Sequence, residues 1–119
     1  PHVEGLDAAD SNGLTALHWA ARGGHARVCQ ALLRHPHFTE VNREDSLGRS
    51  ALHLAARNGH SKACAELLRG PRFDAVWSRD LEGLTALHYA ALRGHESVCE
   101  ALTKHAGFQQ WYDEEGSDS

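Results

Sequence analysis

The sequence predicts an all-α solenoid of stacked helix-turn-helix units joined by β-turn finger loops. Three similar segments, beginning at Asp10, Asp45 and Asp80, follow one another at a spacing of 35 residues. Segments 10–35 and 80–105 are identical at 16 of 26 aligned positions. A repeat of about 20–50 residues is typical of a stacked array, in which each unit buries its apolar face against its neighbours. We therefore expect function on the surface that the units share.

The 119 residues are predicted to form a single array. Its parts are a partial repeat 1–9, repeats 10–44, 45–79 and 80–112, and an acidic tail 113–119. Residues 1–10 align with the connectors that begin at Pro36 and Pro71. The chain is therefore expected to begin part-way through an earlier repeat, and to exist as a monomer or as part of a longer array.

Each repeat opens with a turn and a first helix. Asp at the first position of the turn and Gly three residues later is type I turn chemistry. Thr15, Ser50 and Thr85 follow as helix N-caps, because a hydroxyl can accept a backbone N–H of the first helical turn. Glycine, which takes positive φ without steric cost, is expected to end each helix. The predicted first helices cover residues 16–22, 51–57 and 86–92, ended by Gly24, Gly59 and Gly94.

A second helix follows in each repeat. These helices are predicted to begin near Ala26, Ser61 and Glu96 and to run about nine residues, since apolar residues recur there at helical spacing. Pro36 and Pro71 end the first two, because proline cannot donate a backbone hydrogen bond. An extended stretch is expected to close each repeat.

Composition argues against several classes of function. The net charge of −4 argues against non-specific nucleic-acid binding, which needs a basic stripe. There is no apolar run of about 18 residues to enter a membrane, and no secretory leader is visible. Cys29, Cys64 and Cys99 share one repeat position. Stacked helices lie about 8–10 Å apart, too far for a disulfide. We expect buried free thiols and an intracellular protein, cytoplasmic or nuclear.

Ten histidines raise the hypothesis of a metal site. Six of them recur once per repeat, so their nitrogens are expected to lie too far apart to share one zinc ion, which needs ligands at about 2.0–2.1 Å. The sequence also lacks a phosphate-binding loop and a nucleophile elbow. We expect no metal, no cofactor, no small-molecule substrate and no catalytic activity in this chain alone.

The strings GLTALHWAARGGH, GRSALHLAARNGH and GLTALHYAALRGH resemble the ankyrin repeat, whose consensus reads G-x-T-P-L-H-x-A-A-x-x-G-H. The resemblance covers essentially the whole chain. Ala16, Ala51 and Ala86 stand where the family has proline, and the period of 35 exceeds the usual value of about 33. The resemblance implies that the histidine of each TALH or SALH string forms a framework hydrogen bond between the turn and the first helix.

In ankyrin arrays, variable finger-tip and first-helix positions line a concave binding surface. Here the resemblance assigns that surface to Ser11, Asn12, Leu14, Arg22, Gly23, Glu44, Ser46, Leu47, Arg49, Arg57, Asn58, Arg79, Leu81, Glu82, Leu84, Leu92 and Arg93. Apolar tips (Leu14, Leu47, Leu81, Leu84 and Leu92) accompany an arginine stripe, which we define as Arg22, Arg49, Arg57, Arg79 and Arg93. Because arginine binds carboxylates with a bidentate fork, we expect an acidic, partly apolar partner segment. The alternative is a solvated face with scattered leucines.

Large side chains at other positions have more ordinary explanations. Trp19, Leu54 and Tyr89 share one helix position, for which the resemblance implies packing between repeats; an aromatic groove is the alternative. Trp77 and Trp111 are expected to make local packing contacts or to contact a further repeat. The segment Glu40-Val41-Asn42 is similar to a site of Asn hydroxylation in some ankyrin repeats, although the connector alone explains it.

The leading interpretation is a protein–protein interaction module that binds a protein or peptide on its concave surface. A second interpretation is a targeting or regulatory segment of a larger enzyme, such as a ubiquitin ligase or a kinase. A third is a structural spacer or a designed protein without a natural ligand.

Overall fold

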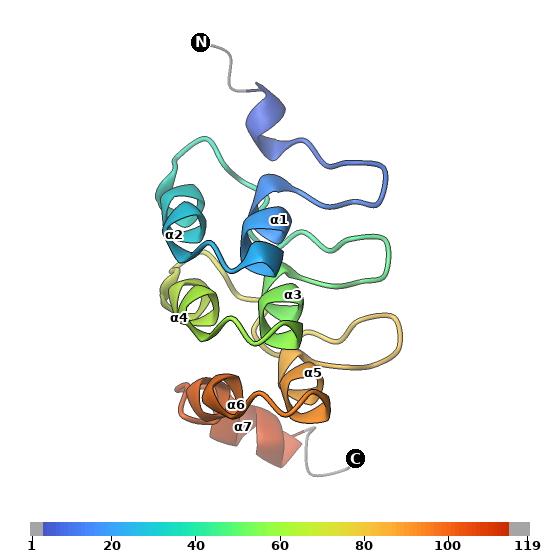
Figure 1. Ribbon diagram of the computed structural model, residues 1–119, viewed down its shortest axis with the longest axis vertical. Helices are drawn as coiled ribbons and strands as arrows, with labels where there is room; N and C mark the ends of the chain where they lie inside the picture. Colours follow the sequence, from blue (N-terminus) through green and yellow to red (C-terminus); the bar gives the residue numbers. More distant parts are fainter. Residues whose placement is uncertain (1–3, 115–119) are drawn as a thin grey trace.

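A computed structural model describes residues 4–114 as two columns of stacked helices (Figure 1). A short 3-10 helix, Glu4–Asp7, precedes the stack. The helices are α1 (Ala16–Gly23), α2 (Ala26–Arg34), α3 (Ala51–Arg57), α4 (Ser61–Arg69), α5 (Ala86–Leu92), α6 (Glu96–Thr103) and α7 (Phe108–Glu114). The first helices α1, α3 and α5 pack in one column, and the second helices α2, α4 and α6 pack in another. The predicted all-helical stack is confirmed.

Long loops project from the α1–α3–α5 side of the stack, one before each first helix (Figure 1). We call these loops fingers 1, 2 and 3; their turns begin at Asp10, Asp45 and Asp80. None of the helices described for residues 4–114 reaches the length and apolar character that a membrane span requires.

Reciprocal hydrogen bonds begin each first helix, as the N-cap residues predicted. The hydroxyls of Thr15 and Ser50 accept the backbone N–H of the histidine three residues later, at 3.5 and 3.3 Å. In return, Nδ1 of His18 and Nδ1 of His53 each accept the backbone N–H of the cap residue at 3.0 Å. Thr85 and its histidine repeat the arrangement in α5. Such caps typically contribute about 1 kcal/mol each to helix stability.

The same histidines also join neighbouring repeats. Nε2 of His18 lies 3.1 Å from the carbonyl oxygen of Arg49, and Nε2 of His53 lies 2.9 Å from that of Leu84. Because Nδ1 is already an acceptor and a carbonyl can only accept, Nε2 carries the proton and the ring is neutral. Burial lowers the pKa of both histidines below 6.5, which favours this neutral form. The framework hydrogen bond between the turn and the first helix, implied by the family resemblance, is the Nδ1 bond to the cap residue, and it is confirmed.

Small and branched side chains fill the space between the columns. Ala20, Ala55 and Ala90 are buried at one position of successive first helices, where they let the helices approach closely. The thiols of Cys29 and Cys64 are buried as predicted, and burial raises their pKa values to about 11 and about 12. Cys99 is only partly buried. All three cysteines are free thiols.

The connectors between repeats bind one another through side chains. Asn42 donates from Nδ2 to the carbonyl of Arg72 at 2.9 Å and accepts the N–H of Asp74 at 2.8 Å. Thr39 is held in the same way, because its backbone N–H donates to the Asp7 carboxylate at 2.7 Å. The Asn42 amide therefore has a structural role at the junction of two connectors.

The segment after α6 differs from the prediction. An extended connector and a tail from residue 113 were expected there, but Phe108–Glu114 forms helix α7. Ala106 stands where Pro36 and Pro71 stand in the earlier repeats, so no proline restricts the chain before this helix. Trp111 packs inward and stacks on Trp77, with ring centroids 4.9 Å apart. The two tryptophans make local packing contacts, one of the two predicted alternatives. Residues 1–3 and 115–119, within the predicted partial repeat and tail, lie outside the described residues.

Candidate functional site

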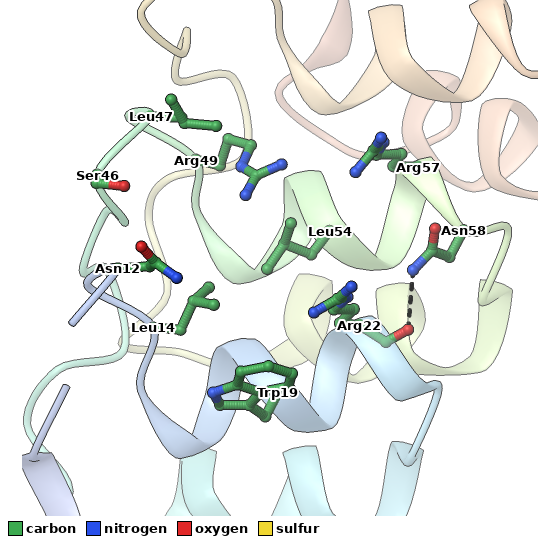
Figure 2. Close-up of a pocket in the computed structure, with 10 residues that line it drawn as sticks. All are labelled: Asn12, Leu14, Trp19, Arg22, Ser46, Leu47, Arg49, Leu54, Arg57 and Asn58. Carbon is green, nitrogen blue, oxygen red and sulfur yellow. Dashed lines mark hydrogen bonds between the residues drawn. The ribbon is translucent and has the colours of Figure 1, made fainter. Parts of the chain in front are cut away.

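Two adjoining hollows lie between the fingers and the first helices. The first, of about 430 Å³, opens between repeats 1 and 2 and is lined by Asn12, Leu14, Trp19, Arg22, Ser46, Leu47, Arg49, Leu54, Arg57 and Asn58 (Figure 2). The second, of about 360 Å³, is lined by Leu47, Arg49, Arg57, Glu82, Tyr89, Leu92 and Arg93. Leu47, Arg49 and Arg57 line both hollows. We call the combined depression the concave groove.

The fingers that form one wall of the groove are held rigidly by backbone hydrogen bonds. In each turn one carboxylate oxygen of the Asp accepts two backbone N–H groups; for Asp10 these are the N–H groups of Asn12 and Leu14, both at 2.9 Å. Neighbouring fingers are also joined: the N–H of Ser46 donates to the carbonyl of Asn12 at 2.9 Å. The N–H of Leu81 donates in the same way to the carbonyl of Leu47 at 3.0 Å. The groove wall is thus a ladder of linked turns.

The second carboxylate oxygen of each turn Asp binds a different side chain in each repeat. Trp19 donates its indole N–H to Asp10 at 3.1 Å. In repeat 3, the hydroxyl of Tyr89 donates to Asp80. Leu54 occupies the corresponding position of repeat 2 and has no donor, and there Nε of Arg49 donates to Asp45 at 2.8 Å. Fingers 1 and 3 are therefore tied to their own first helices by an aromatic side chain, whereas the bond from Arg49 lies within finger 2.

These bonds set the charge on the groove wall. The backbone N–H of Leu14 is the largest cause that lowers the pKa of Asp10, followed by the N–H of Asn12 and the indole of Trp19. Burial and the hydrogen bond to Asp80 raise the pKa of Tyr89 to about 12, so its hydroxyl stays protonated and donates. The pKa values of Asp10 and Asp80 are lowered, so these two carboxylates remain ionised at neutral pH, and both are already bound by donors of the protein.

The arginine stripe divides into two groups. Arg49 is paired with Asp45, and Arg79 donates to the carbonyl of Gly83 at 2.8 Å, so these two stabilise their own fingers. The guanidinium of Arg22 lies 5.1 Å from the ring centroid of Trp19, within cation–π range. Within the part of the chain that the structure describes, the guanidinium groups of Arg57 and Arg93 make no ion pair or hydrogen bond. We call Arg22, Arg57 and Arg93 the groove arginines.

Most of the predicted surface residues lie in the groove, but not all. The predicted residues that line it are Asn12, Leu14, Arg22, Ser46, Leu47, Arg49, Arg57, Asn58, Glu82, Leu92 and Arg93. Ser11, Gly23, Glu44, Arg79, Leu81 and Leu84 line neither hollow. Whether any of them meets a partner remains a prediction.

Two expectations about apolar residues are wrong. Leu14 is not an apolar tip, because it is only 7 % exposed, although it lines the first hollow. Trp19 is not buried packing, because it is 48 % exposed and lines the groove, whereas Leu54 at the same position is buried. Tyr89 is partly exposed and lines the second hollow. The sequence did contain a signal for the exposure of these aromatic residues. Nine residues after the turn Asp, repeats 1 and 3 have an aromatic side chain with a hydrogen-bond donor, whereas repeat 2 has leucine.

Other chemistry finds little support in the described residues. Among residues 4–114, no group of three or more His, Cys, Asp or Glu side chains is arranged to hold a metal ion. The thiols lie in or against the helix packing, and burial raises the pKa of each. A raised pKa makes a thiol a poor nucleophile at neutral pH.

Comparison with known families agrees with this architecture. A family model described as ankyrin repeats (three copies) matches residues 2–76 and 37–114. The chain belongs to the ankyrin repeat family. Ankyrin repeats are a non-catalytic module that generally binds other proteins. No curated protein sequence matches this ankyrin repeat chain.

Proposed function

We propose that this ankyrin repeat array binds a segment of another protein in the concave groove. The segment presents carboxylates to the groove arginines and apolar side chains to Trp19 and Leu47. The observation that carries this proposal is the guanidinium of Arg57, which has no anionic partner among the described side chains and lines both hollows of the groove.

Partial burial of Arg57 strengthens the electrostatic argument. A cation that is partly removed from water interacts more strongly with a nearby anion, because the effective dielectric constant around it is lower. Charge-assisted hydrogen bonds from arginine to carboxylates are also shorter and stronger than neutral ones. A partner carboxylate at Arg57 therefore gains more than one at a fully exposed arginine would.

Trp19 supplies a preorganised apolar contact. Its indole N–H is bound to Asp10 and its ring is covered on one face by Arg22, so the side chain loses little freedom when a partner binds. Leu47 is 53 % exposed on the finger wall that faces the groove. Tryptophan and arginine are the residue types most often found at the energetic centre of protein interfaces.

The free thiols favour an intracellular location for this binding, since unpaired cysteines persist in reducing compartments. We assign the chain no catalytic role of its own, and no nucleic-acid or membrane partner.

Selection from a library of displayed random peptides tests the proposal. The immobilised chain is expected to enrich peptides that combine Asp or Glu with large apolar residues. The double variant Arg57→Glu/Arg93→Glu should weaken binding of the enriched peptides by about tenfold or more, because two attractive contacts become repulsive. Unchanged affinity in the double variant, or enrichment of peptides without acidic residues, would rule the proposal out.

Arg27→Glu provides a control for charge reversal outside the groove. Arg27 is exposed on α2, away from the groove, so its replacement changes the net charge without changing the groove. This variant should bind the peptides nearly as well as the unaltered chain. Circular dichroism melting curves of all variants establish that the fold is intact.

A further inference from the structure

The groove arginines form a line that runs along the stack, one per repeat. Arg22 and Arg57 occupy the same position of α1 and α3, and Arg93 lies one residue further along, beyond the end of α5. Figure 2 shows the first two reaching into the groove from successive helices, with Leu54 between them. Packed helices lie about 8–10 Å apart. From the helix spacing we infer an interval of about 8–10 Å between successive cations of the groove.

This spacing restricts the backbone of the occupant, because its carboxylates must lie on one face at the same interval. A β-strand returns to one face every second residue, at about 6.6 Å or 13 Å, and matches poorly. A polyproline II helix returns every third residue, at about 9.3 Å. An α-helix returns after seven residues, at about 10.5 Å. Only the last two conformations fit the arginine line.

The finger wall favours the polyproline II conformation. The side chains of Asn12 and Ser46 face the first hollow and make no hydrogen bond within residues 4–114. A polyproline II segment leaves its backbone carbonyls without internal partners, and these two side chains can donate to them. An α-helix has already satisfied its backbone carbonyls, so Asn12 and Ser46 would have no backbone acceptor of the occupant to bind.

Aromatic side chains support the same choice. Each hollow contains one partly exposed aromatic ring, Trp19 in the first and Tyr89 in the second. Polyproline II segments commonly dock in aromatic-lined grooves, because their conformation is formed before binding and costs little entropy. The two rings recur along the groove with the cations.

We propose that the groove recognises a proline-rich segment in polyproline II conformation with an acidic residue at every third position. The carboxylates bind Arg22, Arg57 and Arg93 in turn, and the residues between them contact Trp19 and Tyr89. This inference rests on the proposed function and specifies its ligand.

Three synthetic peptides test the spacing by fluorescence anisotropy with the whole chain. The first repeats the triplet Glu-Pro-Leu three times. The second has the same composition, with its three glutamates placed together at one end. The third is an alanine-rich helical peptide with glutamate at every seventh position. We expect the first peptide to bind about tenfold more tightly than the second, because the second cannot reach three arginines at once. Equal affinity of the first two peptides, tighter binding of the third, or no binding of any would overturn the inference.

Two protein variants connect the result to the assigned residues. Arg57→Gln should remove most of the difference between the first and second peptides, whereas the control Arg27→Gln should preserve it. Asn12→Ala should weaken the proline-rich peptide by a few-fold and leave the helical peptide unaffected. A difference between the peptides that survives in Arg57→Gln contradicts the assignment.

The display selection separates failure of this inference from failure of the proposed function. If the selected peptides depend on Arg57 and Arg93 but carry acidic residues at helical spacing, the polyproline II assignment is wrong and the groove remains a binding site. If no selected peptide depends on these arginines, both proposals are wrong.

Discussion

Two glycines at equivalent positions of neighbouring fingers allow two contributions to the free energy of unfolding to be measured separately. One contribution is the contact between the fingers, and the other is backbone strain. Gly48 and Gly83 both have positive φ, at 78° and 83°. A Cβ on Gly48 would lie 2.9 Å from the backbone nitrogen of Leu81, whereas a Cβ on Gly83 would meet no atom within 4 Å. Replacement of either glycine by alanine therefore imposes the same conformational penalty, and only Gly48→Ala also forces fingers 2 and 3 apart.

The expected magnitudes follow from these two contributions. A non-glycine residue in the left-handed region costs about 1–2 kcal/mol, and the lower entropy of the unfolded alanine chain offsets about 0.4–1 kcal/mol. Gly83→Ala should thus lower the free energy of unfolding by about 1 kcal/mol. Gly48→Ala also disturbs the hydrogen bond from the Leu81 N–H to the Leu47 carbonyl, worth about 1 kcal/mol, and the backbone must shift. Its total cost should be about 2–3 kcal/mol.

Urea denaturation monitored by circular dichroism measures both variants under one condition. The two midpoints should differ while the slopes with denaturant stay equal, because the surface exposed on unfolding is unchanged. Gly48→Ala should also weaken peptide binding, since Leu47 lines both hollows. Equal destabilisation of the two variants, within about 0.5 kcal/mol, would refute the reasoning that the fingers brace one another.

Two further predictions concern buried polar groups. Arg49→Leu should lower the free energy of unfolding by about 1 kcal/mol, because Asp45 loses a charge-assisted donor. Adding Leu54→Tyr should recover most of this loss, because repeat 3 has Leu84 and Tyr89 at these positions and Tyr89 donates to Asp80. A double-mutant cycle measured by urea denaturation that shows no coupling between the two changes would contradict this prediction. Stability should fall as the pH drops below about 6.5, because His18 and His53 are held neutral with lowered pKa values and the unfolded chain takes up protons first. Urea midpoints at a series of pH values measure this loss, and a flat profile between about pH 7 and pH 5, above the range where carboxylates titrate, would exclude it.

The stack and its helices were predictable because local residues encode them. Turn aspartates, N-cap hydroxyls and C-terminal glycines each act within a few residues of themselves, and their threefold repetition fixed the phase. The first helices begin at the predicted residues, with α1 one residue longer at its end. For the helices, the repeat pattern gave a wrong prediction after α6, where the sequence departs from the pattern. Ala106 replaces a proline, and Trp111 finds a partner in Trp77 that alignment of the copies does not reveal.

The groove was harder to predict because its charge depends on which side chains already have partners. Arg49 and Arg79 stood beside Arg57 in the sequence pattern as equal members of one stripe. In the structure, Arg49 binds Asp45 and Arg79 binds the carbonyl of Gly83, each four residues away. The spacing of the residues alone could not show that these two arginines have partners while the guanidinium of Arg57 has none among the described residues. The exposure of Trp19 likewise depends on the orientation that Asp10 gives its indole.

The links between fingertips are made by main-chain atoms alone. Asparagine, leucine and glutamate therefore occupy one equivalent tip position, at Asn12, Leu47 and Glu82, without cost to the scaffold. Natural variation or protein engineering can therefore change the chemistry of this surface by single substitutions at the tip positions. Such changes would alter what the array captures and leave its architecture in place.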